Sequence, residues 1–215
     1  MTDKKLQVAL DLFHVREALD ILEEVGEYVD IIEVGTPLCV SEGAAAVREI
    51  KRAWPDKIVF ADIKVMDGGG DVPKSVIEAG ADMFSVLAAT DDNTLSAARE
   101  LATKTGTKLL VDMCNVTDME RRGVEVDAFE PDYVCCHVGY GLQGTGVDPI
   151  EELKRLSAVR APKAIAGGIK ADTFEQAVGS IAEDIIVGGG IVNAKDRAAT
   201  AKWMRGVLDS ANLTR

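Results

Sequence analysis

The sequence predicts a single (β/α)8 TIM barrel, and three observations lead to that fold class. Short apolar segments alternate with longer amphipathic ones along the chain, as in repeated βα units around a parallel sheet. The 215 residues leave about 27 for each of eight such units, which suffices for a compact barrel. No linker, low-complexity tract or change in composition interrupts the pattern, so we expect one domain over residues 1–215.

The eight predicted strands are short runs dominated by apolar residues. In chain order they are Leu6–Leu10, Val29–Val34, Lys57–Ala61, Asp82–Leu87, Lys108–Val111, Asp132–Cys136, Lys163–Ala166 and Asp184–Val187. An open, doubly wound sheet is the competing architecture. The chain lacks a phosphate-binding fingerprint after its first strand, which disfavours that alternative.

Amphipathic stretches that we predict to be helices separate the strands. Examples are Val15–Val25, Glu42–Ala53, Asp92–Thr105 and Arg197–Asp209. In the stretch that starts at Asp92, Leu95, Ala98 and Leu101 recur at helical spacing, and charged residues fall on the other faces. This pattern is typical of a helix that covers a barrel.

The composition indicates a globular protein that acts on small molecules. Hydrophobic residues make up 47% of the chain and the formal net charge is −12, with a pI near 4.7. Such a charge repels nucleic acids and anionic membranes, although a local basic site can still bind a phosphate. We therefore expect small-molecule substrates or further copies of the chain as partners.

The sequence also predicts a cytoplasmic location. No run approaches the roughly 18 apolar residues of a membrane-spanning helix, and the first residues lead into a strand without a signal-peptide core. Cys39, Cys114, Cys135 and Cys136 show no CxxC spacing. We interpret all four as packed thiols, with Cys135 and Cys136 on opposite faces of one strand.

Ionisable residues stand where five of the predicted strands end, at Asp11, Glu33, Asp62, Asp112 and His137. The carboxyl ends of the strands form one mouth in a (β/α)8 barrel, and the active site lies there. Because side chains alternate along a strand, Lys64 shares a face with Asp62. These two could form a plain surface ion pair, but the recurrence at other strand ends favours a functional site.

The acidic residues at this mouth outnumber its lysine. Three or four carboxylates around Lys64 repel one another unless a cation joins them. Hard oxygen ligands from Glu33 and Asp62 suit Mg²⁺ better than zinc. The sequence therefore predicts a magnesium site formed by these two residues.

His137 is one of two histidines in the chain, and it closes a predicted strand. A single histidine in such a place is often a satisfied core residue. Its position among carboxylates favours a role as a general base instead. The other histidine, His14, follows Asp11 at the start of a helix, and we assign it no role.

Glycines stand at the ends of the last two predicted strands, in Ala166-Gly167-Gly168 and Val187-Gly188-Gly189-Gly190. Glycines allow backbone amides to approach an anion closely, and the loops after strands seven and eight commonly bind phosphate in such barrels. Tight turns could also require these glycines. Their presence on neighbouring strands favours a phosphate ester as the substrate.

The segment from Gly139 to Gly144 matches the pattern GxGxxG after a strand. No helix opens directly from it and it follows the sixth strand, so we reject a dinucleotide site. The loop continues to Gly146 beside His137. A mobile lid over the site and a plain loop are both open interpretations.

With these residues in hand, the chain resembles the orotidine 5'-phosphate decarboxylase superfamily. Within it, the chain is similar to the branch of 3-hexulose-6-phosphate synthase and 3-keto-L-gulonate-6-phosphate decarboxylase. The resemblance covers nearly the whole chain and rests on four motifs. They are Gln7-Val8-Ala9-Leu10-Asp11, the run from Val29 through Glu33 to Thr36, Ala61-Asp62-Ile63-Lys64-Val65-Met66-Asp67, and Ala166-Gly167-Gly168.

The resemblance implies roles for individual residues. It places the magnesium ligands on Glu33 and Asp62, and the acids that contact the substrate on Asp11 and Asp112. Asp62, Lys64 and Asp67 match the D-x-K-x-x-D signature, in which Asp67 reaches across a homodimer interface into the active site of the partner. The glycines of the phosphate-binding turns correspond to Gly168, Gly188 and Gly189.

Several positions favour the synthase branch. The decarboxylase branch typically carries an arginine three residues after the histidine of strand six, where this chain has Tyr140. Met66-Asp67 and Val111-Asp112 match the synthase pattern, as does the His-Val-Gly sequence that starts at His137. The loop from Gly139 to Gly146 is unusual for either branch.

The resemblance implies a lyase that joins formaldehyde to D-ribulose 5-phosphate through an enediolate, or runs the reverse cleavage. Here His137 is the base, Lys64 adds positive charge and Asp67 orients Lys64. Decarboxylation of 3-keto-L-gulonate 6-phosphate is the first alternative, since it shares the intermediate. A phosphosugar epimerase is disfavoured by the small number of histidines at strand ends, and the full set of charged groups disfavours a noncatalytic phosphosugar-binding barrel.

Overall fold

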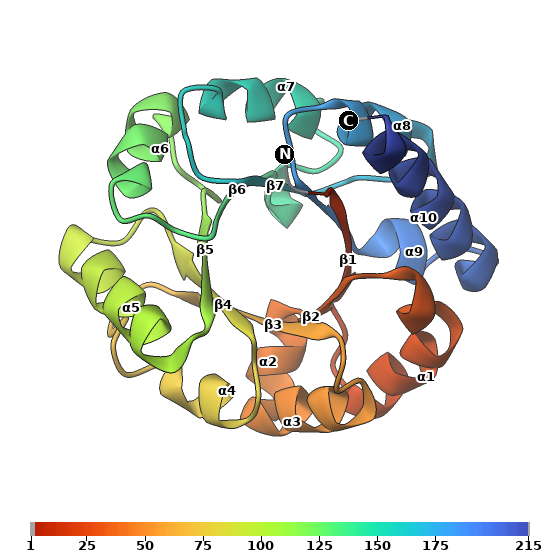
Figure 1. The fold of residues 1–215 in the computed structure, drawn as a ribbon, viewed down its shortest axis with the longest axis horizontal. Helices are drawn as coiled ribbons and strands as arrows, with labels where there is room; N and C mark the ends of the chain where they lie inside the picture. The colour runs from red at the N-terminus through yellow and green to blue at the C-terminus, as the bar shows by residue number, and fades with distance from the viewer. Residues whose placement is uncertain (1–2, 215) are drawn as a thin grey trace.

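A computed structural model describes residues 3–214 and shows a closed barrel of eight parallel strands in the order β1 to β8 (Figure 1). The predicted fold class is therefore confirmed. The strands are β1 Lys5–Leu10, β2 Ile31–Val34, β3 Ile58–Val65, β4 Met83–Leu87, β5 Lys108–Asp112, β6 Tyr133–His137, β7 Lys163–Ala166 and β8 Asp184–Val187. The pairing of β1 with β8 closes the barrel.

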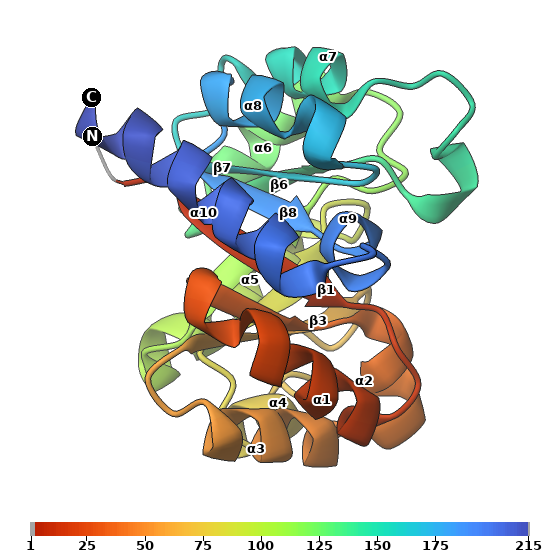
Figure 2. The ribbon, with the colours of Figure 1, turned by 90° about the vertical axis from the view of Figure 1, so that its right-hand side faces the viewer.

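Helices surround this ring of strands (Figures 1 and 2). The α-helices are α1 Val15–Val25, α2 Thr36–Glu42, α3 Ala44–Ala53, α4 Lys74–Glu78, α5 Asp92–Thr105, α6 Met119–Asp127, α7 Pro149–Leu153, α8 Ala171–Gly179, α9 Gly189–Val192 and α10 Arg197–Leu213. Short 3-10 helices lie at Gly26–Tyr28, Tyr140–Leu142 and Lys154–Leu156. The last helix, α10, packs against α1 and α8, so the end of the chain covers the seam beside β1.

The structure corrects several of the predicted boundaries. The expected strand Val29–Val34 starts at Ile31, and the expected helix Arg197–Asp209 continues to Leu213. The expected helix Glu42–Ala53 is divided, because Gly43 takes a positive φ of 60° between α2 and α3. Glycine adopts that conformation readily, whereas other residues are strained in it. The expected strand Lys57–Ala61 continues through Lys64 to Val65, with an irregular register against β4. The prediction ended this strand too early because charged residues seldom lie inside a strand that is buried on both sides.

Two apolar layers hold the barrel together. Alternate residues of each strand point outward to the helices, as Val8, Val134 and Cys136 do. The others point into the barrel, where Phe60 and Cys135 belong to a separate inner cluster. Cys135 and Cys136 therefore face opposite sides of β6, as predicted. The inner cluster fills the barrel below the carboxyl ends of the strands and leaves those ends to form a cavity.

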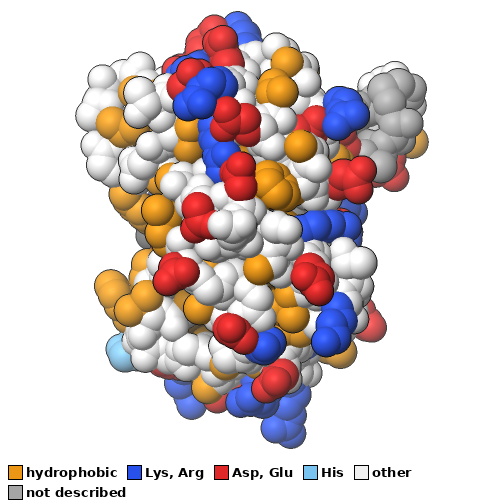
Figure 3. All heavy atoms as spheres, turned by 90° about the vertical axis from the view of Figure 1, so that its left-hand side faces the viewer, with side chains coloured by type: hydrophobic (Ala, Val, Ile, Leu, Met, Phe, Trp, Pro, Cys, Tyr) orange, Lys and Arg blue, Asp and Glu red, His pale blue; other side chains and the backbone are white. Residues whose placement is uncertain are grey.

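Charged side chains of both signs lie on the face of the molecule that carries α5 and α6. On this face, Lys and Arg side chains are interspersed with Asp and Glu (Figure 3). Ion pairs such as Arg121 with Glu125 and Arg122 with Asp92 lie there. Within residues 3–214, no helix combines the length and the apolar character needed to cross a membrane.

Asp184 is an unusual residue at the amino-terminal end of β8. Its side chain is completely buried, and neither carboxylate oxygen has a hydrogen-bond partner among the described residues. Burial, followed by the nearby charge of Asp30, raises the pKa of Asp184 to about 8, although Lys5 and Lys108 act in the opposite direction. The folded protein therefore holds a proton on this carboxyl that the unfolded chain releases at much lower pH.

We expect Asp184→Asn to change how stability depends on pH. A carboxyl whose pKa is raised on folding contributes stability below its unfolded pKa, near 3.8, and that contribution is lost as the pH rises to about 8. The melting temperature of the wild type should thus fall more between pH 5 and pH 8 than that of D184N, which carries no charge at this position. Circular dichroism melts across this range provide the measurement. Asp20→Asn, at an exposed position on α1, is the control; parallel curves for wild type and D184N would contradict the assignment.

Candidate active site

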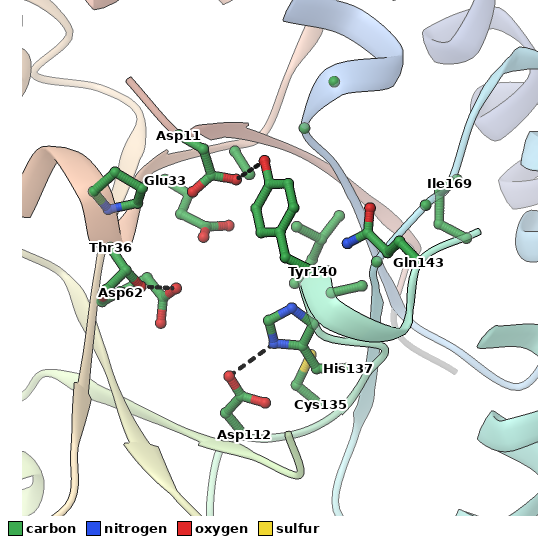
Figure 4. Close-up of a pocket in the computed structure, with 18 of the residues that line it drawn as sticks. Asp11, Glu33, Thr36, Asp62, Asp112, Cys135, His137, Tyr140, Gln143 and Ile169 are labelled. Carbon is green, nitrogen blue, oxygen red and sulfur yellow. Dashed lines mark hydrogen bonds and ion pairs between the residues drawn. The ribbon is translucent and has the colours of Figure 1, made fainter. Parts of the chain in front are cut away.

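A cavity of about 830 Å³ opens at the carboxyl ends of the strands (Figure 4). Each residue that the sequence predicts for the site lines it, with the exception of Asp67. The lining set includes Asp11, Glu33, Asp62, Lys64, Asp112, His137, Gly168, Gly188 and Gly189. Residues that are up to 178 positions apart in the chain therefore meet at the mouth that the strand-end pattern predicted.

The ammonium group of Lys64 lies between two carboxylates, one from β3 and one from β5. Its Nζ lies 2.8 Å from Asp62 Oδ2 and 2.9 Å from Asp112 Oδ2. Burial by itself lowers the pKa of the Lys64 ammonium, but the charges of Asp112 and Asp62 outweigh it and raise that pKa above its ordinary value. Lys64 is therefore a fixed positive charge in the cavity.

Asp112 in turn holds His137. Its Oδ2 atom lies 2.9 Å from His137 Nδ1, and its other oxygen accepts a hydrogen bond from the backbone N–H of Cys114. Burial raises the pKa of Asp112, but the hydrogen bond and charge of His137, together with Lys64, lower it below its usual range. A charged carboxylate can only accept, so Nδ1 carries the proton when the ring is neutral. The lone pair is then on Nε2, where a base needs it.

Two hydroxyl residues that the sequence analysis did not select hold Asp62 in place. Thr36 Oγ1 lies 2.7 Å from Asp62 Oδ2, and Ser85 Oγ lies 2.7 Å from Asp62 Oδ1. Ser85 also accepts a hydrogen bond from the backbone N–H of Lys64. The sequence offers one signal for Ser85. It lies inside the apolar strand β4, where a buried hydroxyl needs a polar partner.

The backbone at Lys64 departs from an ordinary strand. Its φ is 44°, in the left-handed region that residues with side chains seldom adopt. The departure coincides with the irregular register between β3 and β4. The surrounding contacts of Asp62, Ser85 and Asp112 maintain this conformation, which directs the ammonium between the two carboxylates.

Glu33 and Asp11 lie on the opposite side of Asp62 from Asp112 (Figure 4). Glu33 accepts a hydrogen bond of 2.6 Å from Gln7 Nε2 and is buried. Burial, followed by repulsion from Asp62 and Asp11, raises the pKa of Glu33 well above its usual value. Burial and the charge of Asp62 also raise the pKa of Asp11. The carboxylates at this end of the cavity are therefore not fully neutralised by positively charged side chains.

The donor set fits a magnesium ion, since the surplus carboxylates supply hard oxygen ligands and a divalent cation would relieve their repulsion. No three acidic, histidine or cysteine side chains of residues 3–214 converge to form a metal cage. Magnesium usually takes one or two carboxylates and completes its coordination with water and substrate. Glu33 and Asp62, the predicted ligands, match that requirement.

Glycines at the ends of β7 and β8 form the other side of the cavity. A Cβ on Gly167, whose φ is 97°, would lie 2.1 Å from the carbonyl oxygen of Val138. A Cβ on Gly190 would lie 2.5 Å from the carbonyl oxygen of Ile169. The two turns therefore pack against neighbouring backbone so closely that both positions require glycine. This closeness leaves a surface of main chain facing the cavity.

Asp67 lies outside the cavity of its own chain. Its side chain is exposed, and Oδ1 accepts a hydrogen bond from the backbone N–H of Gly68. The predicted contact between Asp67 and Lys64 is therefore not present within one chain. The implied role of Asp67 in the site of a partner subunit stays a prediction.

The loop from Gly139 to Gly146 contributes two further residues that line the cavity. The hydroxyl of Tyr140 lies 3.5 Å from Asp11 Oδ2 across the mouth (Figure 4). The Cγ atom of Gln143 would lie 4.0 Å from a Cβ built on Gly168. Sequence reasoning singled out Tyr140 only as a departure from the decarboxylase pattern and missed Gln143. The loop thus lies over the mouth, and its action as a lid stays a prediction.

Comparisons with known proteins show which proteins this chain is similar to. The sequence model of the Orotidine 5'-phosphate decarboxylase / HUMPS family matches residues 4–204. The chain is 47% identical to the 3-hexulose-6-phosphate synthase of Bacillus subtilis (strain 168), over 95% of this chain and 98% of that protein. It is similar to the crystal structure of 3-hexulose-6-phosphate synthase from Salmonella typhimurium, with a TM-score of 0.93, 37% identity and coverage of 96% and 99% of the two chains. A 3-keto-L-gulonate-6-phosphate decarboxylase from Vibrio cholerae has a TM-score of 0.85 at 27% identity, over 97% of this chain and 99% of that one.

Proposed function

Because the chain belongs to the orotidine 5'-phosphate decarboxylase / HUMPS family, we propose that it joins formaldehyde to D-ribulose 5-phosphate, or runs the reverse cleavage. The product is a 3-hexulose 6-phosphate, and the enzyme is a lyase. Identity of 47% to a synthase and of 27% to a decarboxylase supports the choice between the two branches. The main structural support for this reaction is that one oxygen of Asp112 contacts both Lys64 and His137.

The reaction begins when His137 Nε2 removes a proton from C1 of the sugar phosphate. Asp112 orients the ring and stabilises the imidazolium that forms. Lys64 places a positive charge beside the enediolate oxygens. C1 of the enediolate then forms a bond to the carbon of formaldehyde as the C=O π bond of the aldehyde breaks. The oxygen of the former aldehyde takes up the proton that His137 removed from C1, so that His137 is neutral again. Asp11 binds substrate hydroxyls, and Asp112 is positioned to do the same.

We propose Mg²⁺ as the cofactor, with Glu33 and Asp62 as its protein ligands. When bound, the ion supplies further positive charge for the oxygens that become negative in the enediolate. Thr36 and Ser85 keep Asp62 oriented toward the cavity through the two hydrogen bonds described above. Gln7 does the same for Glu33.

The proposal includes a homodimer with shared active sites and a cytoplasmic location. Asp67 is exposed and does not line the cavity of its own chain, which supports a role in the site of a partner. From there its carboxylate orients Lys64. The phosphate of the substrate lies against the turns that contain Gly168, Gly188 and Gly189, whose main chain borders the cavity.

Consumption of formaldehyde by the purified protein tests this function. With D-ribulose 5-phosphate and Mg²⁺ we expect rapid loss of formaldehyde, and with EDTA in place of Mg²⁺ we expect little. Restoration by added Mg²⁺ controls for damage by the chelator. Release of CO2 from 3-keto-L-gulonate 6-phosphate, without any formaldehyde consumption, would instead assign the chain to the decarboxylase activity.

A further inference from the structure

The side chains that line the cavity carry more negative than positive charge, which is unfavourable for binding a phosphate ester. Four carboxylates line it, at Asp11, Glu33, Asp62 and Asp112, against the two ammonium groups of Lys64 and Lys170. A phosphate monoester carries between one and two negative charges at neutral pH. The two positive charges of a magnesium ion held by Glu33 and Asp62 would be balanced by those same two carboxylates. The phosphate therefore needs a positive charge of its own.

Lys64 does not meet that requirement. Its ammonium lies between Asp62 and Asp112, within 3 Å of an oxygen of each. These carboxylates belong to β3 and β5, whereas the glycine turns follow β7 and β8. In the closed order of strands, β7 and β8 are separated from both by at least one other strand.

Lys170 is placed where the charge is needed. It follows Gly167-Gly168-Ile169 directly and precedes α8. Its Cα would lie 3.2 Å from a Cβ built on Gly190, so the end of the β7 turn touches the β8 turn at this residue. Lys170 is exposed and lines the cavity, and it forms no ion pair with any residue between 3 and 214.

We propose that Lys170 is a specificity-determining residue whose ammonium pairs with the phosphate of the substrate. The inference rests on the proposed function, because it assumes that the glycine turns receive a phosphate. Lysine binds phosphate as a mobile point charge, so an exposed and unpaired side chain beside the turns can close on the ligand. The backbone of the turns forms the surface against which the phosphate lies. The ammonium of Lys170 favours binding of a charged phosphate ester over an uncharged sugar.

Replacement of Lys170 by methionine tests the proposal. We expect the KM for D-ribulose 5-phosphate to rise about tenfold to a hundredfold with kcat nearly unchanged, as for the loss of one charge-assisted hydrogen bond. K170R should restore most of the affinity. Activity with D-ribulose, which lacks the phosphate, should be the same in K170M and wild type. A KM for K170M equal to that of the wild type would overturn the proposal.

Lys195→Met is the matched control, because Lys195 is also exposed, forms no ion pair within the described part of the chain and does not line the cavity. K195M removes the same charge from the molecule and should keep the KM of the wild type. Calorimetric titration with inorganic phosphate separates this inference from the proposed function. Weaker phosphate binding by K170M than by K195M supports the role of Lys170 even if the wild type consumes no formaldehyde, and equal binding overturns it.

Discussion

Replacement of His137 by asparagine should abolish exchange of the C1 proton while leaving the substrate bound. Asparagine can still donate a hydrogen bond to Asp112 Oδ2, which now lies 2.9 Å from the histidine Nδ1. It offers no basic nitrogen to the cavity. General base catalysis commonly contributes about 10² to 10⁴ in rate, and we expect kcat to fall by that factor. Exchange of the C1 proton of D-ribulose 5-phosphate in D2O, followed by NMR without formaldehyde, measures the step directly.

The second histidine supplies the control for this experiment. His14 is exposed at the start of α1, where its Nδ1 lies 3.4 Å from Glu42. H14N should exchange the proton at the rate of the wild type. Calorimetric binding of the substrate to H137N should stay within a few-fold of the wild type. If H137N exchanges the proton at the normal rate, the base is another group.

Lys64→Met is the other variant from which we expect a large effect. The change leaves Asp62 and Asp112 facing each other without the cation that now lies between them. Loss of one group that stabilises developing charge commonly costs about 10² to 10³ in kcat. Because the two carboxylates are nearly buried, with side chains 9% and 3% exposed, we also expect a lower melting temperature. Steady-state kinetics and a thermal melt of the same preparation provide both measurements.

Lys51→Met separates the two effects of K64M. Lys51 forms an ion pair of 2.8 Å with Asp82, and its side chain is 25% exposed, close to the 26% of Lys64. It lies on α3 and does not line the cavity. K51M should therefore lose some stability and keep its kcat. Retention of the full kcat by K64M would remove Lys64 from the proposed mechanism.

Local patterns were sufficient to predict the barrel and the members of its mouth. Apolar runs that alternate with amphipathic segments leave little choice other than a parallel βα sheet, and β7 and β8 lie at the predicted residues. Asp11, Glu33, Asp62, Asp112 and His137 could be selected from their positions at strand ends. Each position depends only on its own strand, because parallel strands in a barrel bring their carboxyl ends to one face.

Other features depend on residues that are distant in the sequence. Thr36 and Ser85 become supports of Asp62 only when β3 lies between β2 and β4. Asp184 looked like an ordinary start of a strand, and its complete burial follows from the closure of β8 on β1. No periodicity in the chain reports such contacts, since they depend on how strands align with one another.

Spacing along single strands is enough to predict the class of fold, the acid-rich mouth and the glycine turns. How the charges pair depends instead on the packing of the strands against one another. Alternation placed Lys64 beside Asp62, but its positive φ and its approach to Asp112 arise from the irregular pairing of β3 with β4. The pairing of β7 with β8 likewise brings Lys170 and Gly190 together at the end of the cavity. Electrostatic pairing requires distances of a few ångströms between strands, and only the packed barrel sets them.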